Sequence, residues 1–427
     1  MKKKQWFLRR SFLTYSGILA GTVALNLLAR SSTAFSDLYI EWIFPIWINT
    51  LGRFMGIFPF SVGEILIGAG LLYAASAVAV ALLLSAALAV GAVGRWKSGA
   101  RMLASGPPGG QEPGARKLEA RILASGPPGA QPLGEKYRGL FRFGYKFYLG
   151  FAWSLLILFL LLTLGGFLLY HGSTFAQRYF PAEGETYTAE ELIAVRNFVV
   201  EQCNRLSAEM SRDEAGNVLY AGNMTNEAIE SMLGLGQTYE RLNGYYPPPK
   251  PLLLSDFCCQ QYIQGYFFPF SMEANYNRVM YLANKPATLC HELAHMRGYI
   301  LEDEANFIGF LACVSSDDAF FQYSGYLSVL NYLDNDFYRL VGRDRARYMQ
   351  ETAILPQVVS DNVFVTSAEW ERIEKHSLLE TEAVDAATDL LMDTNLKANG
   401  VSDGKLSYSR VVQLVLQYYK QLPGSRL

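Results

Sequence analysis

The stretch that decides the fold of the C-terminal half is His291-Glu292-Leu293-Ala294-His295. Pro286 and Ala287 precede it and indicate the start of a helix, because proline favours the first helical turn. Two histidines four residues apart project from one face of a helix and can bind the same ion. Glu292 lies one step round the helix, where it can hold a metal-bound water and take its proton. The stretch therefore predicts a Zn²⁺ site with Glu292 as the catalytic base.

The third metal ligand is expected in the acidic stretch Glu302-Asp303-Glu304-Ala305-Asn306. Gly298 can end the first helix in a left-handed turn, after which the chain enters a second helix. On that helix Glu302, Asn306 and Gly309 share a face, whereas Glu304 points nearly the opposite way. We therefore expect Glu302 to be the third ligand, with Glu304 as the alternative. Asn306 would accept a hydrogen bond from a ligand histidine through its side-chain carbonyl.

Four further residues are considered for chemistry. Tyr323 or Tyr326 could donate to a developing oxyanion, and we include Tyr326 in the predicted catalytic set; aromatic core packing is the alternative. His376 stands among charged residues and is expected on a solvated helix face. Cys290 is expected in the core, because adjacent residues diverge on a helix and it cannot share an ion with His291. The five cysteines contain no CxxC spacing, so the sequence indicates neither a zinc ribbon nor a disulfide framework.

HExxH followed by Glu-x-x-x-Asn resembles the glutamate-zincins, a class of zinc metallopeptidases. The resemblance implies that His291, His295 and Glu302 bind zinc and that Asn306 orients a histidine. Only six residues separate His295 from Glu302, far fewer than in thermolysin-like enzymes. That gap is closer to the metzincins, which place glycine where Gly298 stands, but Leu301 occupies the position of their third histidine.

A wider set of motifs resembles an uncharacterised bacterial membrane-protein family, a domain of unknown function. The resemblance covers essentially the whole chain except a Gly/Pro-rich repeat. It implies a zincin-like domain on an N-terminal membrane bundle, and it supplies no substrate. The motifs besides HELAH are Gly265-Tyr266-Phe267-Phe268-Pro269-Phe270, Glu273-Ala274-Asn275-Tyr276-Asn277, Glu302-Asp303-Glu304-Ala305-Asn306-Phe307 and Tyr323-Ser324-Gly325-Tyr326.

Composition and hydropathy predict a membrane anchor. Of 427 residues, 51% are hydrophobic and only 18% are charged, whereas about 25% charged is usual for soluble proteins. Three long apolar stretches, about 11–29, 65–94 and 147–170, are each long enough to cross a bilayer. The first could instead be a cleaved signal peptide, but its apolar run is longer than a usual signal core. We expect three spans within a membrane domain of residues 1–170.

Charge patterning predicts the orientation. Residues 1–170 hold 17 Lys and Arg against 6 Asp and Glu, whereas residues 171–427 hold 20 against 33. The basic residues concentrate before the first span and in residues 95–146, so both segments are expected in the cytoplasm. Residues 95–146 also contain a repeated Gly/Pro-rich stretch (101–109 and 121–129), which is typical of a flexible linker. We therefore expect a bacterial inner-membrane protein with a cytoplasmic N-terminus and an extracytoplasmic acidic domain, residues 171–427, that does not bind nucleic acid.

The expected fold is this three-span α-helical anchor joined to a mainly α (α+β) zincin-like domain. Helical patterns cover roughly 225–242, 317–333, 367–397 and 408–421, and Thr188 with Glu191 predicts a capping box. The best strand candidates are 251–254 and 278–283, and the latter could be an edge strand that aligns a peptide. The aromatic segment 39–60 is expected either to lie in the membrane interface or to pack on the external domain.

The function expected from these features is a membrane-anchored zinc metallopeptidase acting on a peptide or protein substrate, with the lipid bilayer as its other partner. The alternative is a catalytically inactive metal-binding domain that serves as a receptor or assembly scaffold. A transport role is disfavoured, because Glu64 is the one acidic residue near a span and stands at its edge.

Overall fold

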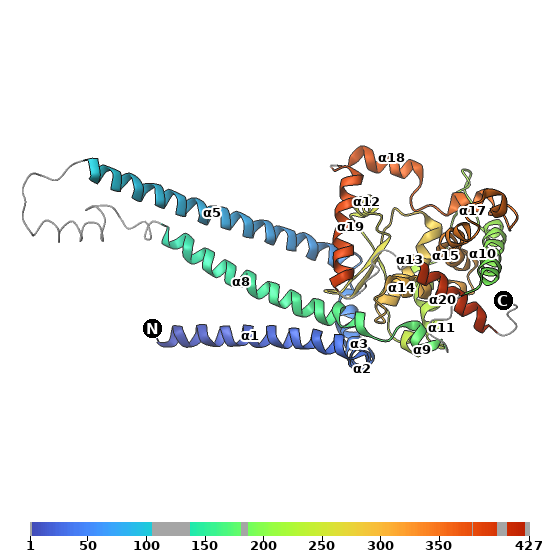
Figure 1. Cartoon of the computed structure of the whole chain (residues 1–427), viewed down its shortest axis with the longest axis horizontal. Helices are drawn as coiled ribbons and strands as arrows, with labels where there is room; N and C mark the ends of the chain where they lie inside the picture. The colour runs from blue at the N-terminus through green and yellow to red at the C-terminus, as the bar shows by residue number, and fades with distance from the viewer. Residues whose placement is uncertain (1, 105–136, 181–186, 378, 399–407, 423–427) are drawn as a thin grey trace, which may run out of the picture. The chain divides into compact units, whose positions relative to one another are not determined.

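The computed structural model describes residues 2–104, 137–180, 187–377, 379–398 and 408–422, and the described chain is mostly helical (Figure 1). It divides into two compact units. The first comprises Met1–Ser16 and Leu66–Phe159, and the second, here called the C-terminal unit, comprises Gly17–Ile65 and Leu160–Leu427. The predicted domain boundary lies between residues 170 and 171. It differs from the boundary of this unit because one end of each long N-terminal helix packs with residues 171–427, here called the C-terminal domain.

Three helices are long and apolar enough to cross a membrane, as predicted: Arg10–Ser31, Val62–Val90 and Arg138–His171. They belong to α1 (Lys2–Ser31), α5 (Val62–Ala104) and α8 (Arg138–Leu162), and α8 continues into the turns η3 (Thr163–Phe167) and η4 (Leu169–His171). The chain is therefore a membrane protein. Because α5 and α8 run beyond the predicted spans, the stretch between them is shorter than the expected 95–146. Most of the Gly/Pro-rich repeat, from residue 105 onward, lies outside the described residues.

Within the first unit, α5 and α8 pack closely. The ring of Tyr73 lies 5.6 Å from that of Phe147 and 5.2 Å from that of Phe151, measured between centroids. Gly144 permits the approach, since a Cβ atom there would stand 2.7 Å from a methyl carbon of Leu84. Small residues at such crossings let apolar helices approach each other in lipid, where the hydrophobic effect between them is weak.

The segment between α1 and α5 packs against the C-terminal domain, which was one of its two expected placements; the other, in the membrane interface, stays a prediction. Tyr39, Ile40, Phe44 and Ile48 are buried in the same core as the domain's helices. The segment consists of α2 (Thr33–Leu38), η1 (Tyr39–Ile43), α3 (Phe44–Trp47), η2 (Ile48–Gly52) and α4 (Arg53–Met55).

The C-terminal domain is built mainly from helices. They are α9 (Phe175–Tyr179), α10 (Ala189–Glu209), α11 (Met224–Leu235), η5 (Glu240–Leu242), α12 (Ser255–Gln260), η6 (Leu282–Asn284), α13 (Lys285–His295), α14 (Glu302–Val314), α15 (Ala319–Leu340), α16 (Arg345–Tyr348), α17 (Pro356–Asp361), α18 (Ser367–His376), α19 (Thr381–Ala398) and α20 (Tyr408–Gln421). The predicted capping box at Thr188 begins α10. Of the predicted helices, 408–421 is confirmed as α20, whereas 367–397 is two helices and 225–242 ends early as α11 before the short turn η5.

The centre of the domain is the packing of α13, α14 and α15. Gly309 of α14 permits the closest approach: a Cβ there would stand 2.8 Å from the carbonyl oxygen of Ala287 and 3.1 Å from the amide nitrogen of His291. Gly325 of α15 has the same role toward α14, where its Cβ would stand 2.8 Å from the Cβ of Cys313. These two glycines bring the backbone of α14 close to both neighbouring helices.

A small sheet covers α13. Its order is β1-β3-β2, with β1 (Lys250–Pro251) parallel and β2 (Gly265–Phe268) antiparallel to β3 (Glu273–Tyr276). Both strand predictions were wrong in place. Only Pro251 of 251–254 is in a strand, and of 278–283 the first three residues form bends and the last two begin η6. The edge strand that lies nearest residues His291–His295 of α13 is β2.

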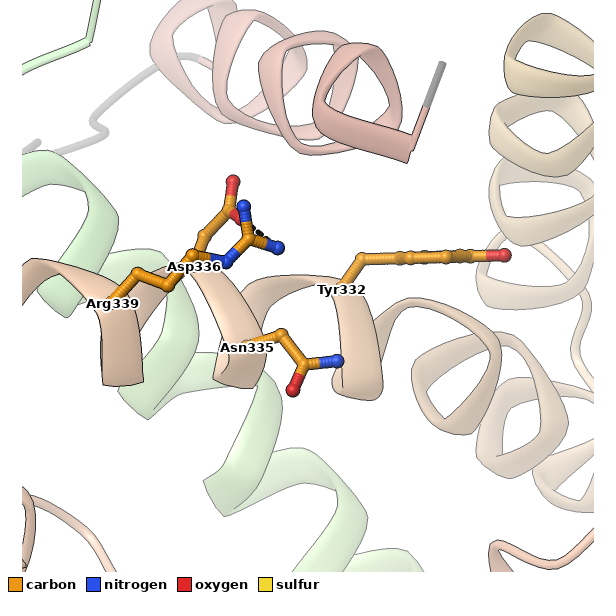
Figure 2. Close-up of a pocket in the computed structure, with 4 residues that line it drawn as sticks. All are labelled: Tyr332, Asn335, Asp336 and Arg339. Carbon is orange, nitrogen blue, oxygen red and sulfur yellow. Dashed lines mark ion pairs between the residues drawn. The ribbon is translucent and has the colours of Figure 1, made fainter. Parts of the chain in front are cut away.

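A surface cavity of about 220 Å³ lies along α15 (Figure 2). Its lining includes an ion pair of 3.2 Å between Asp336 and Arg339, and the hydroxyl of Tyr187 donates to Asp336 at 3.3 Å. The other lining residues are Tyr332 and Asn335. None of the predicted site residues lines this cavity.

Candidate metal centre

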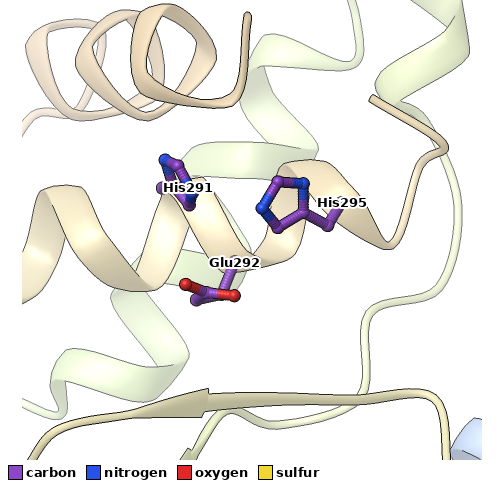
Figure 3. A group of neighbouring side chains, drawn as sticks. All are labelled: His291, Glu292 and His295. Atoms are coloured by element: carbon purple, nitrogen blue, oxygen red, sulfur yellow. The ribbon is translucent and has the colours of Figure 1, made fainter. Parts of the chain in front are cut away.

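His291, Glu292 and His295 lie together on α13, and their ligand atoms are all within 4.8 Å of one another (Figure 3). Pro286 in the first turn starts the helix, as the sequence predicted. The helix ends at His295, and Gly298 adopts the left-handed conformation with φ +83°. The chain therefore reverses within six residues and begins α14 at Glu302.

Glu302 is the carboxylate that the fold brings to the histidines. Its Oε2 lies 3.2 Å from Nε2 of His291, and its Oε1 lies 3.9 Å from Nε2 of His295. The Glu302 side chain is 56% exposed, whereas both imidazoles are largely buried. Two ring nitrogens and one carboxylate thus converge at a place that is open to solvent on the Glu302 side. Zinc sites with three protein ligands of these types leave a further position for water or substrate.

The remaining ring nitrogens are held by oxygen atoms. Nδ1 of His291 lies 2.9 Å from the side-chain oxygen of Asn306, and Nδ1 of His295 lies 2.7 Å from the carbonyl oxygen of Tyr299. Because a carbonyl oxygen only accepts, each Nδ1 must carry the proton in the neutral imidazole. That tautomer leaves the lone pair on Nε2, the atom that faces Glu302.

Glu292 is buried at 3% exposure and faces the sheet. Among the described residues, nothing gives its Oε2 atom a hydrogen-bond partner. The strand β2 passes directly over it, because a Cβ on Gly265 would stand 2.7 Å from Oε1 of Glu292. A buried carboxylate oxygen without a partner is costly, so such atoms are expected where a ligand or water completes the site.

Glu302 and the two histidines shift one another's pKa values. Burial opposes protonation of His291, but the hydrogen bond and charge of Glu302 outweigh it and raise its pKa to about 9. The same contact with His291 lowers the pKa of Glu302 to about 2. Burial and the charge of His291 lower the pKa of His295 to about 4. Burial raises the pKa of Glu292 to about 8, so this carboxyl group favours its neutral form in the absence of a cation.

The structure does not bring Glu304 to the histidines. Its carboxylate accepts a hydrogen bond from the amide of Phe175, on the other side of α14. Burial raises the pKa of this carboxyl to about 8. Glu304 therefore links α14 to α9 through this hydrogen bond. Glu302 is the acidic residue of α14 that faces His291 and His295.

The tyrosines proposed for oxyanion stabilisation make other contacts. Tyr326 packs with Phe198 and Phe310, with ring centroids 6.1 Å away in each case. The hydroxyl of Tyr323 donates to Asp361 at 2.7 Å. These are core contacts, and none of the partners belongs to the histidine cluster. Cys290 is buried in the core, as expected.

Sequence reasoning missed two contributors to the site. The carbonyl of Tyr299 orients His295, and a backbone acceptor leaves no signal in side-chain identity. Phe267 of β2 lies beside His295, with ring centroids 6.3 Å apart. In the sequence, the motif 265–270 stands out only through a family resemblance, because its position over α13 depends on the pairing of β2 with β3.

One known protein family matches the larger part of the chain. The family described as "Protein of unknown function (DUF3810)" matches residues 134–416, about two thirds of the chain. This match covers α8 and all elements of the site, and the chain belongs to this family. No curated protein and no solved structure matches the chain.

Proposed function

We propose that the chain is a membrane-anchored zinc metallopeptidase with a zincin-like C-terminal domain. The observation that supports this proposal best is the direction of the two imidazoles. Oxygen atoms of Asn306 and Tyr299 hold both Nδ1 atoms, so both Nε2 atoms face the carboxylate of Glu302. Two imidazoles and one carboxylate with oriented partners are a donor set that suits Zn²⁺.

In this proposal His291, His295 and Glu302 hold the zinc ion. Zinc bound by such ligands supplies Lewis-acid chemistry and lowers the pKa of a water molecule. Glu292 is the general base, and its partnerless Oε2 is the atom that accepts the proton. Gly265 matters because any larger residue would collide with this carboxylate. Oxyanion stabilisation by Tyr326 stays a prediction, and the contacts of its ring are aromatic core contacts.

The substrate in this proposal is a peptide or protein. Among the described strands, β2 pairs only with β3, so its other edge has no strand partner. An extended peptide would add a strand beside the histidines, which is a common mode of peptide recognition. This assigns to β2 the role that the sequence suggested for 278–283.

The proposed location is the bacterial inner membrane, with the N-terminus in the cytoplasm and the site outside it. The excess of basic residues before α1 and between α5 and α8 supports this orientation. Protease added to spheroplasts should digest the C-terminal domain. Digestion only after lysis would indicate the opposite orientation. It would not bear on the proposed zinc site.

The function is tested on the full-length protein purified in detergent. We expect about one zinc per chain and hydrolysis of members of a broad peptide panel. Glu292→Gln should keep the zinc and lose hydrolysis, because the amide cannot accept the proton. The control is Glu230→Gln, an exposed glutamate on α11, which should change neither.

Two outcomes would contradict the proposal. Protein without bound zinc after purification and zinc addition would exclude the metal site. Zinc-loaded protein that hydrolyses nothing, or whose hydrolysis is unaffected by Glu292→Gln, would favour the alternative of a metal-binding receptor or scaffold.

A further inference from the structure

The C-terminal unit contains the histidine cluster and one end of each candidate span. Residues 17–31 of α1, 62–65 of α5 and 160–171 of α8 and its following turns belong to this unit. Side-chain contacts join them to it: Nδ2 of Asn26 donates to Oγ1 of Thr163 at 2.9 Å, and Ala29 is buried in the common core. The ends of the spans and the cluster are therefore parts of one packed body.

Two carboxylates join the first turn of α5 to the sheet. Glu273 of β3 accepts from the amides of Val62 and Gly63 at 3.1 and 2.8 Å, and it pairs with the buried Lys250. In the opposite direction, Glu64 of α5 accepts from the amides of Leu253 and Leu254, at 2.8 Å each. Amides in the first turn of a helix have no partners within it, so Glu273 acts as a cap for the span.

The strand β2 runs from this turn to the site. At one end Phe268 lies against α5, because a Cβ on Gly63 would stand 2.8 Å from its ring. At the other end Gly265 lies over Glu292, and Phe267 between them lies beside His295. A strand rises about 3.3 Å per residue, so roughly 10 Å separate the two ends. The candidate catalytic base is therefore about this far along the strand from the first turn of a span.

The loop that Glu64 holds is apolar and exposed. Leu253 and Leu254 are 53% and 62% exposed, and Phe257 in the next turn is also exposed. The exposed guanidinium of Arg278 donates to the carbonyl of Leu253 at 3.3 Å. Single exposed apolar residues are ordinary on soluble surfaces. Here three of them adjoin the start of a span together with a cation, which is the composition of surfaces that enter the bilayer interface.

We propose that the site is held at the bilayer surface and cleaves polypeptide segments next to the membrane, such as the short stems of membrane-anchored proteins. The substrate segment would lie along the open edge of β2, whose far end touches α5. This inference rests on the proposed peptidase function and adds the substrate class. It predicts a preference for the distance between the scissile bond and the membrane.

The location of the site is tested first, independently of activity. The full-length protein is placed in vesicles of phosphatidylcholine and phosphatidylglycerol, with Leu254→Cys labelled by an environment-sensitive fluorophore. The described cysteines are all buried, so labelling is selective for the new thiol. The matched control is Val359→Cys, whose native side chain is 58% exposed. Val359 belongs to α17, a helix that lies across the C-terminal domain from α12 in Figure 1. Spin-labelled lipids should quench the label at position 254 and leave that at 359 unchanged; equal quenching at both would overturn the inference.

The substrate class is tested next with one peptide that the detergent-purified protein cleaves. The zinc-loaded protein in vesicles receives this peptide free, or joined to a double acyl anchor through a spacer of about 6 or about 40 residues, whose extended lengths are roughly 20 and 140 Å. The short spacer should raise kcat/KM about tenfold or more over the free peptide. The long spacer should lose most of this gain, because effective concentration falls roughly as the −3/2 power of length.

The outcomes separate the two proposals. A long spacer that works as well as the short one, or a free peptide cleaved equally well, overturns the membrane-proximal substrate class and leaves the peptidase function intact. Zinc-loaded protein that cleaves no peptide in any form overturns both.

Discussion

The side-chain oxygen of Asn306 lies 2.9 Å from Nδ1 of His291, so the second turn of α14 fixes a ring on α13. The contact depends on Gly309, one turn further along α14, which lets the two backbones approach. It also depends on the tight reversal at Gly298, which returns the chain within six residues. The orientation of His291 is thus set by the packing of two helices.

Replacing Asn306 should weaken the metal site without unfolding it. Asn306→Ala removes the acceptor that orients His291, and loss of such a partner typically lowers metal affinity by about 10- to 100-fold. Asn306→Asp keeps an acceptor and should bind zinc more tightly than the alanine variant. Zinc affinity is measured by competition with chelators, and Asn331→Ala, an exposed amide on α15, is the control. An unchanged zinc affinity in Asn306→Ala would show that Asn306 does not support the metal site.

Glu302 and Glu304 should differ in their effect on zinc. Glu302→Gln removes the negative charge that faces both Nε2 atoms, so bound zinc should fall to a small fraction of about one per chain. Glu304→Gln keeps an oxygen that can accept from the amide of Phe175, so it should keep its zinc. Zinc content by atomic spectroscopy distinguishes the two, and loss of zinc in the Glu304 variant alone would reverse the assignment.

Gly309→Ala should destabilise the C-terminal domain. Its Cβ would stand 2.8 Å from the carbonyl oxygen of Ala287, which is backbone and cannot move away freely. Overpacking of this kind costs about 1–3 kcal/mol of unfolding free energy. Gly234→Ala is the matched control, because nothing lies within 4 Å of its Cβ position in α11. That change should stabilise the helix by about 0.5–1 kcal/mol. Thermal unfolding of the two variants tests this, and equal effects would contradict the close approach of α13 and α14.

Acid should destabilise the domain partly through Asp361. Burial would raise the pKa of this carboxyl, but hydrogen bonds from Arg212, Tyr323 and Gln357 outweigh it and hold the pKa below its usual value of 3.8. A carboxyl with a lowered pKa in the folded state stabilises the fold above its unfolded pKa, and this stabilisation is lost as the pH falls through the folded value.

The matched variant for this prediction is Asp361→Asn, which cannot titrate. Between about pH 6 and about pH 3 the melting temperature of the unmodified protein should fall more than that of the variant. Parallel melting curves for the two proteins would contradict a role of Asp361 in acid sensitivity. The variant itself should be less stable at neutral pH, because Arg212 loses its buried ionic partner.

The strand predictions from the sequence were wrong for a physical reason. Glu273 and Asn275 alternate with Ala274 and Tyr276 in β3, and both polar residues are buried. The residue that neutralises Glu273 is Lys250, in the neighbouring strand, and further partners come from the first turn of α5. Because these partners are distant in the chain, no local pattern of apolar residues marks β3 as a buried strand. The aliphatic run 278–283 had that pattern and is not a strand.

The sequence by itself determined the three apolar helices, because their length and lack of charge are local properties. It also determined the stretch His291–His295, the turn at Gly298 and the shared face of Glu302 and Asn306, since helical periodicity relates residues close in the chain. Only the tertiary structure decided that the carbonyl of Tyr299 holds His295, that Gly265 lies over Glu292, and that Glu273 caps α5. Those relationships depend on the folding of β2 and β3 across α13 and on the packing of α5 against the sheet. They join residues up to about two hundred positions apart, whose pairing is set by burial and hydrogen bonding and not by local pattern.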